Sequence, residues 1–321
     1  MSIIQWRCLA RVLLALSGIA FASLLMAQDY PIKPVRIVTS PAGGGNDFPA
    51  RVVARGLAGP LGQQVIVDNR ATVLIGEIVA KAPPDGYTLL VSGSPHWIGP
   101  LIEKASYDPI ADFAPISMLD RAPVLLVVHP SMPVTSVRAL VRLAKAKPGE
   151  LNYSSGGAGG SNHLGAILFN HMAGVNIVRV PYKGSGPAMT AVMSGEVHLM
   201  FPGIGAAAPH VKSRRLRALA VGSAKPSPFL PGIPTIAASG VPGYESDAKH
   251  ALFAPAGTPA AIIARLHREV VRLFETQQAR DIFFRGGVEA ATCSPEELTA
   301  IMKSERETIG KILRAAGISR P

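Results

Sequence analysis

Two glycine-rich segments of this 321-residue chain have the residue types and spacing of anion-binding loops. The first, residues 41–47, follows an expected strand and leads into an expected helix, with Asp47 predicted as the N-cap. Consecutive glycines let a backbone approach a ligand closely, and the N–H groups at a helix start attract an anion. A tight turn without a ligand fits the same residues. The ligand-binding residues predicted in this loop are Ala42, Gly43, Gly44, Gly45, Asn46 and Asp47.

The second glycine-rich segment, residues 154–162, repeats this design in the other half of the chain. It lacks the Lys-Ser/Thr ending of a nucleotide-binding P-loop. A dinucleotide fingerprint fails too, because Asn162 stands where a third glycine is needed, and Arg179 and Lys183 lie where a ribose-binding acid is expected. What remains is a backbone nest for a small anion such as a carboxylate. Its predicted ligand-binding residues are Ser155, Gly156, Gly157, Gly159, Ser161 and Asn162.

Two further loops follow expected strands and are predicted to contribute side chains. Residues 182–187 offer Tyr182 and Ser185 as hydrogen-bonding groups, although a structural, half-buried tyrosine fits equally well. Residues 92–96 offer Ser94 and His96. Loops at the carboxyl ends of parallel strands are the general place for ligands in open α/β sheets, so a ligand site is expected there.

Sequence signatures of catalysis and of metal binding are missing. The chain has no Gly-x-Ser-x-Gly elbow and no His-Glu-x-x-His zinc signature. His163 and His171 lie eight residues apart on one expected helix, too far for metal ligation from adjacent turns. Cys293 has no neighbouring base in sequence and is predicted to be inert. No catalytic residue, metal ligand or cofactor is predicted, although catalytic triads do assemble from distant positions.

Short apolar runs alternate with helical patterns, which favours βαβ units and a mainly parallel α/β sheet. Residues 124–129 form a nearly unbroken apolar run, typical of a strand buried on both faces. Two similar α/β halves around this run predict two lobes with a cleft. Strands are expected at 35–40, 65–67, 88–92, 124–129, 151–154, 177–180, 197–201 and 216–221. Helices are expected after both glycine loops (to about 57 and 172) and at 75–81, 134–146, 188–194, 259–275 and 295–316, the last capped by Ser294.

The first 27 residues predict an export signal. Arg7 and Arg11 precede an apolar run from Val12 to Met26, and a small-residue cleavage site falls near Ala27. Removing these two arginines and no acids lowers the formal charge from +11 to +9. A single membrane anchor is the weaker alternative, because the run is short and nothing basic follows it. The mature protein is expected to be periplasmic.

The basic charge does not indicate nucleic acid binding. The densest basic stretch, residues 212–217, contains no aromatic side chain on which a base could stack, and aromatic residues make up only 6% of the chain. Anionic small ligands are the alternative that suits an exported protein.

A series of short motifs spans almost the whole chain beyond the signal segment. They are Tyr30-Pro31-x-Lys33-Pro34-x-Arg36, Pro41-x-Gly43-Gly44-Gly45-x-Asp47, Lys-Ala-Pro-Pro-Asp-Gly-Tyr-Thr-Leu-Leu at 81–90, Tyr-Asp-Pro-x-x-Asp-Phe-Ala-Pro at 107–115, Ala-Lys-Ala-Lys-Pro-Gly at 144–149, Ser161-x-His163-Leu164, Val-Pro-Tyr-Lys-Gly at 180–184, Leu-Arg-Ala-Leu-Ala-Val at 216–221, Ala-Pro-Ala-Gly-Thr-Pro at 254–259 and Ala-Ala-Gly-Ile at 315–318. In these motifs the chain resembles the Bug-type periplasmic solute receptors of tripartite tricarboxylate transporters.

The resemblance implies a two-lobed, periplasmic-binding-protein-like α/β fold with the second lobe inserted into the first. Lobe 1 is then expected from residues 28–126 and 225–321, and lobe 2 from 127–224. In such receptors the lobes close on a small carboxylic acid, whose carboxylate the two glycine loops hold through backbone amides and ordered waters.

Three departures from the family pattern bear on the ligand. Residues 71–75 replace a Pro-Gly-Ala-Gly-Gly loop, Pro202 stands in place of an aspartate, and Lys249 replaces an aromatic residue. Losing an anionic group and gaining a cation favours a more anionic ligand and argues against an amino acid. Lys249 is therefore predicted to bind the ligand, and Lys249→Met is expected to weaken a dianion more than a monoanion.

The resemblance implies a monomeric receptor that captures a di- or tricarboxylate or an aromatic acid, for the permease of a tripartite transporter or for a sensor kinase. Two alternatives stay open. An exported enzyme acting on a small carboxylate predicts turnover of the acid. A ligand-free scaffold predicts a plugged cleft, and the apolar residues Val73, Leu74 and Ile75 are candidates for the plug.

Overall fold

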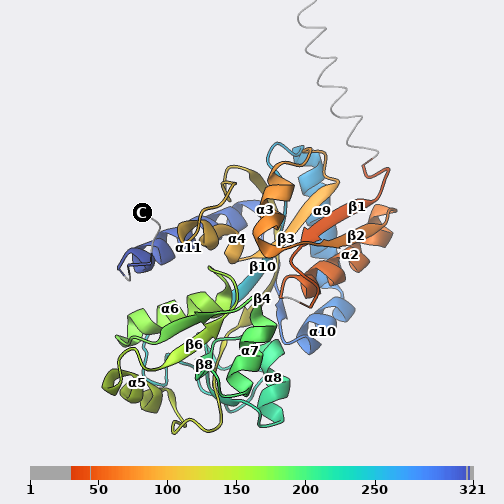
Figure 1. Cartoon of the computed structure of the whole chain (residues 1–321). Helices are drawn as coiled ribbons and strands as arrows, with labels where there is room; N and C mark the ends of the chain where they lie inside the picture. The colour runs from red at the N-terminus through yellow and green to blue at the C-terminus, as the bar shows by residue number, and fades with distance from the viewer. Residues whose placement is uncertain (1–29, 44, 316, 319–321) are drawn as a thin grey trace, which may run out of the picture.

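Two separate β-sheets form the centres of two lobes in the computed structural model, which describes residues 30–43, 45–315 and 317–318 (Figure 1). The two-lobed α/β fold expected from the sequence is confirmed. The predicted signal segment, residues 1–27, and Gly44 of the first glycine loop lie outside the described residues. Within the described residues, no helix is both long and apolar enough to cross a membrane.

The first lobe is built on a six-stranded sheet in the order β11-β4-β10-β3-β1-β2. Its strands are β1 (Val35–Thr39), β2 (Val65–Asn69), β3 (Thr88–Gly93), β4 (Phe113–Pro123), β10 (Asp247–Pro255) and β11 (Glu289–Ala290). Strands β2, β1 and β3 run parallel, whereas β10 pairs antiparallel with β3 and β4. The helical elements of this lobe are α2 (Asp47–Leu61), α3 (Thr72–Ala80), α4 (Pro95–Ile98), the 3₁₀ turn η1 (Gly99–Leu101), α9 (Ala260–Glu275), α10 (Gln277–Arg285) and α11 (Pro295–Ala315).

The second lobe is built on a five-stranded sheet in the order β7-β6-β8-β5-β9. Its strands are β5 (Leu125–Val128), β6 (Asn152–Ser155), β7 (Val178–Pro181), β8 (Leu199–Met200) and β9 (Arg217–Val221). Its helices are α5 (Val137–Ala146), α6 (Ser161–Ala173), α7 (Ser185–Met193) and α8 (Ile204–Lys212). Strand β6 pairs parallel with β7 and β8, but β5 pairs antiparallel with β8 and β9.

The expectation of mainly parallel sheets was wrong, because both sheets are mixed. In lobe 1, β10 runs against β3 and β4, and β11 also runs against β4; in lobe 2, β5 runs against β8 and β9. Strands β4 and β10 were not expected at all. Their apolar pattern is interrupted by prolines at 115 and 123 and by charged residues at 120, 121, 247 and 249, so they do not resemble buried strands in sequence. Pairing with each other over their whole length satisfies their backbones.

Two chain crossings connect the lobes. The chain leaves the first sheet at Pro123, enters the second at Leu125, and returns to the first at Asp247. Beside these crossings, the N–H of Gly222 donates to the carbonyl of Val124 (2.7 Å) and the N–H of Ser246 donates to the carbonyl of Gly222 (2.9 Å). The predicted division into 28–126, 127–224 and 225–321 remains a prediction.

Strand β5 explains why its sequence is a continuous apolar run. Leu125 and Val127 pack on one face of the second sheet with residues of α7 and α8, while Leu126 and Val128 pack on the other with residues of α5 and α6. All four side chains are buried. The expectation of a strand buried on both faces is confirmed.

The cap predicted for the last helix is present. The Ser294 hydroxyl accepts the N–H of Glu297 (3.1 Å), and the Glu297 carboxylate accepts the N–H of Ser294 (2.9 Å). These two bonds form a capping box, which satisfies two otherwise unpaired N–H groups at the start of α11.

Candidate ligand-binding site

The first glycine loop is held from behind by Asp47. Its Oδ2 accepts the N–H of Gly43 (2.9 Å) and the Nε–H of Arg51 (2.9 Å), and its Oδ1 accepts the amide of Asn69 (2.8 Å). Burial raises the pKa of Asp47, but the hydrogen bonds from Arg51, Asn69 and Gly43 outweigh burial and hold the pKa below its usual value. The carboxylate is therefore charged, and its charge is balanced by Arg51.

The prediction that Asp47 caps α2 was wrong. Asp47 is the first residue of the helix, and the N-cap position is taken by Asn46, whose side chain makes no capping bond. The Asp47 carboxylate reaches back to the N–H of Gly43 and also bonds Arg51 and Asn69. Asp47 thus holds the first glycine loop against α2 and β2.

The front of the first glycine loop lies over the β10–β3 pair. A Cβ atom built on Gly45 would stand 3.4 Å from Nε2 of His250, and one on Gly93 would stand 2.6 Å from the carbonyl oxygen of Lys249. Glycine at 93 is therefore required for the two strands to approach. The arrangement brings the loop, the end of β3 and the middle of β10 together.

The second glycine loop is held by different groups. Nε of Arg179 donates to the Ser155 hydroxyl (2.7 Å) and Nη2 donates to the carbonyl of Gly156 (2.9 Å). Nδ1 of His163 accepts the N–H of Gly159 (3.2 Å). Burial, with Arg179 nearby, lowers the pKa of His163 to about 3, so its ring is neutral and able to accept that bond at physiological pH.

Contacts between glycines join the loops of the two lobes. Gly159 has a φ of 72°, and a Cβ there would stand 2.7 Å from the backbone nitrogen of Gly99 in η1. A Cβ on Gly156 would stand 3.2 Å from the carbonyl carbon of Gly184, at the start of α7. The second loop is thus pressed between lobe 1 and the α7 loop, and side chains at these positions would force the backbones apart.

Two predicted residues, Asn162 and Ser185, meet at the same place. The Asn162 amide donates to the Ser185 hydroxyl (3.1 Å), which links the second glycine loop to the start of α7.

Several small residues of the two glycine loops lie in open space. Ser161 is the first residue of α6, and a Cβ atom on Gly157 would have no other atom within 4 Å among the described residues. In the first loop, Ala42 and Gly43 are exposed, as is Gly157 in the second. The N–H of Gly43 is already donated to Asp47 and so is not open to a ligand.

His96 is not available to a ligand, contrary to the expectation from its loop. Its ring is buried between Tyr107, which stacks on it at 5.1 Å, and Phe113 and Phe253. Both ring nitrogens lack a partner among the described residues, and burial lowers the pKa of His96 to about 3. His96 is therefore a neutral core residue of lobe 1, because three aromatic side chains from distant segments enclose it. Ser94, two residues earlier, is also buried.

Lys249 is not a free cation. Its ammonium pairs with Asp247 and with Glu305 (2.7 Å), and the same Glu305 accepts the indole N–H of Trp97 (2.7 Å). Burial lowers the pKa of Lys249, but the two carboxylates outweigh burial and raise it. The positive charge on which its predicted ligand role rests is therefore neutralised within lobe 1.

The Tyr182 hydroxyl has a side-chain partner, and the residues of the predicted plug lie in or beside a helix of lobe 1. The Tyr182 hydroxyl donates to Glu196 (2.8 Å). Residues 72–80 form helix α3, in which Val73 and Leu74 are 78% and 48% exposed while Ile75 packs into the lobe 1 core. These apolar side chains therefore fill no cleft, and the observation that would favour a ligand-free scaffold is missing.

Two residues of the site are not among the predicted ligand-binding residues. In the sequence Arg179 stands out only as a misplaced cation for nucleotide binding, and nothing local ties it to Gly156. His250 sits beside Lys249 and has no signal of its own. Within the described part of the chain, no carboxylate lies within ion-pair distance of Arg179. The second glycine loop consequently carries a net positive charge.

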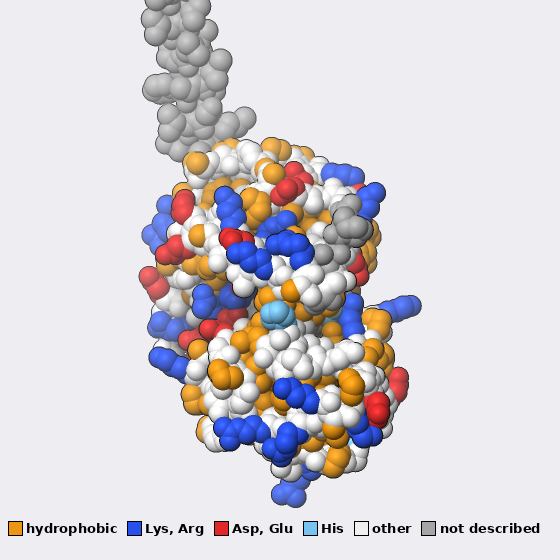
Figure 2. All heavy atoms as spheres, turned by 90° about the vertical axis from the view of Figure 1, so that its left-hand side faces the viewer, with side chains coloured by type: hydrophobic (Ala, Val, Ile, Leu, Met, Phe, Trp, Pro, Cys, Tyr) orange, Lys and Arg blue, Asp and Glu red, His pale blue; other side chains and the backbone are white. Residues whose placement is uncertain are grey.

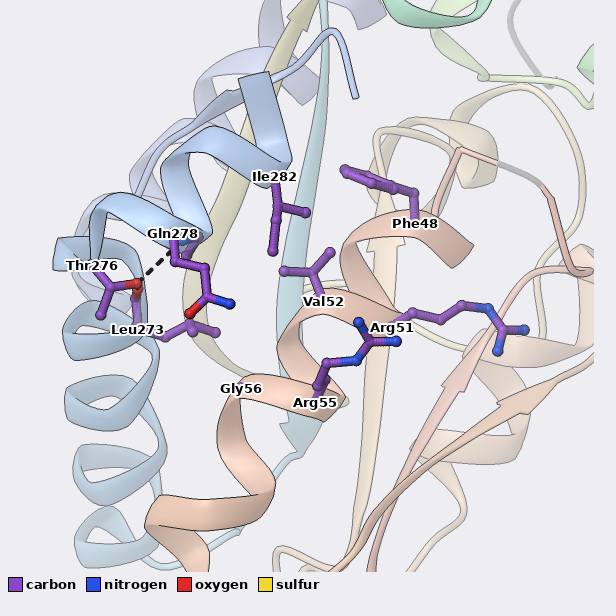
Figure 3. A pocket seen from close by; sticks show the side chains of 10 residues that line it. Phe48, Arg51, Val52, Arg55, Gly56, Leu273, Thr276, Gln278 and Ile282 are labelled. Atoms are coloured by element: carbon purple, nitrogen blue, oxygen red, sulfur yellow. Dashed lines mark hydrogen bonds between the residues drawn. The ribbon is translucent and has the colours of Figure 1, made fainter. Parts of the chain in front are cut away.

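Charged side chains are spread over both lobes, and lobe 1 contains a cavity. Lysine and arginine side chains lie on both lobes together with aspartate and glutamate side chains (Figure 2). A cavity of about 400 Å³ opens between α2, α9 and α10, and Val52, Ile282 and Phe48 point into it (Figure 3). Among the described residues, no cluster of three His, Cys, Asp or Glu side chains suits a metal ion.

These features define a two-lobed protein of the periplasmic-binding-protein type, in which the second glycine loop contacts lobe 1 at Gly99. Residues 49–318 match the model of the tripartite tricarboxylate transporter family receptors (TctC). The chain belongs to this family. The predicted Bug-type resemblance is thereby confirmed.

Named relatives are similar over nearly their full length. The chain is 34% identical to protein BugT of Bordetella pertussis over 318 residues, covering 97% of this chain and 98% of BugT. It is 34% identical over 314 residues to a UPF0065 protein encoded between tcbD and tcbE in Pseudomonas sp. strain P51, covering 93% of this chain and 92% of that protein.

Solved structures share the fold. Rpa4515 of R. palustris, solved with adipate, is 35% identical with a TM-score of 0.85 and covers 90% of this chain and 99% of its own. MatC from Rhodopseudomonas palustris, solved with bound malate, is 28% identical with a TM-score of 0.81 and covers 88% of this chain and 100% of its own. These homologues are binding receptors, not enzymes.

Proposed function

We propose that this chain is a periplasmic receptor that binds a small organic carboxylate between its two lobes, at the glycine loops. The observation that carries the proposal is Arg179, a cation without a carboxylate partner among the described residues, bound directly to the second glycine loop. A carboxylate at the loop's N–H groups would supply the missing negative charge. Related receptors solved with adipate and malate support the same ligand class.

Delivery to the permease of a tripartite transporter is the proposed purpose of binding, with reporting to a sensor kinase as the second route. The family of the chain supports this purpose. Closure of the lobes on the ligand follows if the ligand binds the closed form more tightly than the open one. The contact between Gly159 and Gly99 is the place where such closure brings the lobes together.

Ligand screening of the refolded mature chain tests this proposal. Refolding removes any acid that stays bound during purification. Adipate, malate, citrate, benzoate and amino acids are each added, and the unfolding temperature is recorded. A ligand at about 100 times its Kd adds about 2.7 kcal/mol to the free energy of unfolding, which shifts the unfolding temperature by several degrees. A shift with acids and none with amino acids is expected.

A matched pair of variants locates the binding. Arg179→Gln removes the cation at the second glycine loop, whereas Arg55→Gln removes an exposed arginine on α2. In the first variant the shift is expected to shrink to about a third to a half, and in the second it is expected to stay the same. Equal shifts in both variants would contradict the proposed site, and consumption of the bound acid would favour the exported enzyme.

A further inference from the structure

His250 occupies a position in lobe 1 that faces the first glycine loop. It lies on β10, three residues after the chain returns from the second lobe, and only 8% of the residue is exposed. Its Nδ1 is 2.7 Å from Oδ1 of Asp120, which is fully buried on the neighbouring strand β4. Oδ2 of Asp120 has no partner among the described residues. The buried Asp120 carboxylate therefore fixes the orientation of the His250 ring, and the ring in turn is the hydrogen-bond partner of that carboxylate.

The opposite edge of the ring is left open by a glycine. Nε2 of His250 makes no hydrogen bond with the described residues, and a Cβ on Gly45 would stand 3.4 Å from it. The φ angle of Gly45 is not positive, so its backbone conformation does not require glycine. The side-chain-free position instead keeps Nε2 uncovered beneath the first glycine loop.

We propose that His250 is a ligand-binding residue, whose Nε2–H donates a hydrogen bond to an oxygen of the ligand carboxylate while Asp120 positions the ring. The inference rests on the proposed receptor function and names the lobe 1 contact of that site. With both nitrogens protonated, the ring donates to Asp120 on one side and to the ligand on the other.

The other groups packed around the His250 ring do not take its place as a hydrogen-bond donor to the ligand. Asp120 is the charged group that contacts His250 from β4, whereas Gly93 of β3 and Asn46 and Gly45 before α2 carry no charge. Lys249 and Arg121 alternate with His250 and Asp120 along their strands and so point to the opposite face of the sheet. There Lys249 pairs with Asp247 and Glu305, and Arg121 contacts the Met118 sulfur.

Two variants separate ligand contact from support of the fold. His250→Asn keeps an amide near the position of Nδ1, so it can still donate to Asp120, but it loses Nε2. Gly45→Ala keeps the whole His250–Asp120 pair and places a methyl group over Nε2 at ordinary van der Waals distance. Gly59→Ala is the control, because it adds the same methyl group to an exposed position of α2 outside the proposed site, where nothing lies within 4 Å.

Isothermal titration of the refolded full-length mature chain with adipate, malate and benzoate is the test, with circular dichroism to confirm folding. For the acid that binds, both variants are expected to bind about 10- to 100-fold more weakly, since a hydrogen bond to a charged group is lost. The control is expected to bind within about 3-fold of the original protein.

The outcomes distinguish this inference from the receptor function. If the original protein binds an acid and folded His250→Asn binds it equally well, the role of His250 is overturned and the receptor function stands. If Gly45→Ala binds as the control does, Nε2 does not face the ligand and the inference fails. If the original protein binds none of the three acids, the proposed function fails first.

Discussion

The two glycine loops share a strand–loop–helix design but are held in opposite ways. The first is held by the carboxylate of Asp47, whose charge Arg51 balances. The second is held by the guanidinium of Arg179 and by neutral His163, with no carboxylate pairing Arg179 in the part of the chain that the structure describes. The side chains that hold the first loop are thus neutral overall, whereas those that hold the second loop carry a net positive charge.

This difference indicates which loop selects for charge and which selects for shape. An anion gains most where a cation lacks a partner, so the second loop is expected to supply most of the electrostatic attraction. The first loop places backbone and the edge of His250 without a net charge of its own. Local sequence does not reveal this difference, because both loops consist of glycines followed by a polar helix start.

The contact between Gly159 of the second glycine loop and Gly99 of lobe 1 is predicted to have the largest effect on binding. In Gly159→Ala, a methyl group would stand 2.7 Å from the nitrogen of Gly99 on a residue with a φ of 72°. Backbone strain of this kind costs about 1–3 kcal/mol, so affinity is expected to fall about 30-fold as the lobes are held apart. Small-angle scattering with ligand is expected to show a wider separation of the lobes than in the original protein. Unchanged affinity would mean that the lobes need not meet at Gly159.

Removing the charge of the second loop is predicted to have the next largest effect. Arg179→Gln is expected to weaken carboxylate binding about 10- to 30-fold, since charge-assisted hydrogen bonds to the loop and the local positive charge are lost. Arg51→Gln, the corresponding change behind the first loop, is expected to reduce affinity less than about 5-fold because it leaves Asp47 held by Asn69 and Gly43. Titration of both variants with the same acid measures the difference. A larger loss in Arg51→Gln would reverse the assignment of the two loops.

The first loop is predicted to respond to acid through Asp47. Its lowered pKa means that its stabilising contribution is fully present above the unfolded value of about 3.9 and is lost as the pH falls through the folded value. Asp47→Asn is expected to lower the free energy of unfolding at pH 7 by about 1–2 kcal/mol, with a smaller deficit at pH 3. Urea unfolding at the two pH values measures this change. An equal deficit at both would mean that the charge of Asp47 does not hold the loop.

Lys249 is predicted to have the smallest effect on ligand choice. Because Asp247 and Glu305 balance its charge, Lys249→Met is expected to change the affinities for a monoanion and a dianion by the same factor, within about 2-fold. The free energy of unfolding falls instead, because two carboxylates lose their partner. Titration with benzoate and adipate measures the ratio. A selective loss for the dianion would restore the role that the sequence alone suggested for Lys249.

The glycine loops are easier to predict from the sequence than the side chains that hold them, for a physical reason. Glycine runs, helix caps and apolar strands are local signals, so both glycine loops, strand β5 and the Ser294 cap could be predicted. The pairing of His250 with Asp120 joins residues 130 positions apart, and it depends on β10 lying against β4. His96 shows the same limit, since its polar type suggested a surface role while aromatic residues at 107, 113 and 253 enclose it.

A crystal structure of the refolded chain with its tightest-binding acid tests the central claim most directly. The account predicts a carboxylate between the lobes, with its oxygens within hydrogen-bond distance of the N–H groups of the Arg179-held second loop and of Nε2 of His250. The acid bound in the cavity between α2, α9 and α10, with both glycine loops unoccupied, would contradict it.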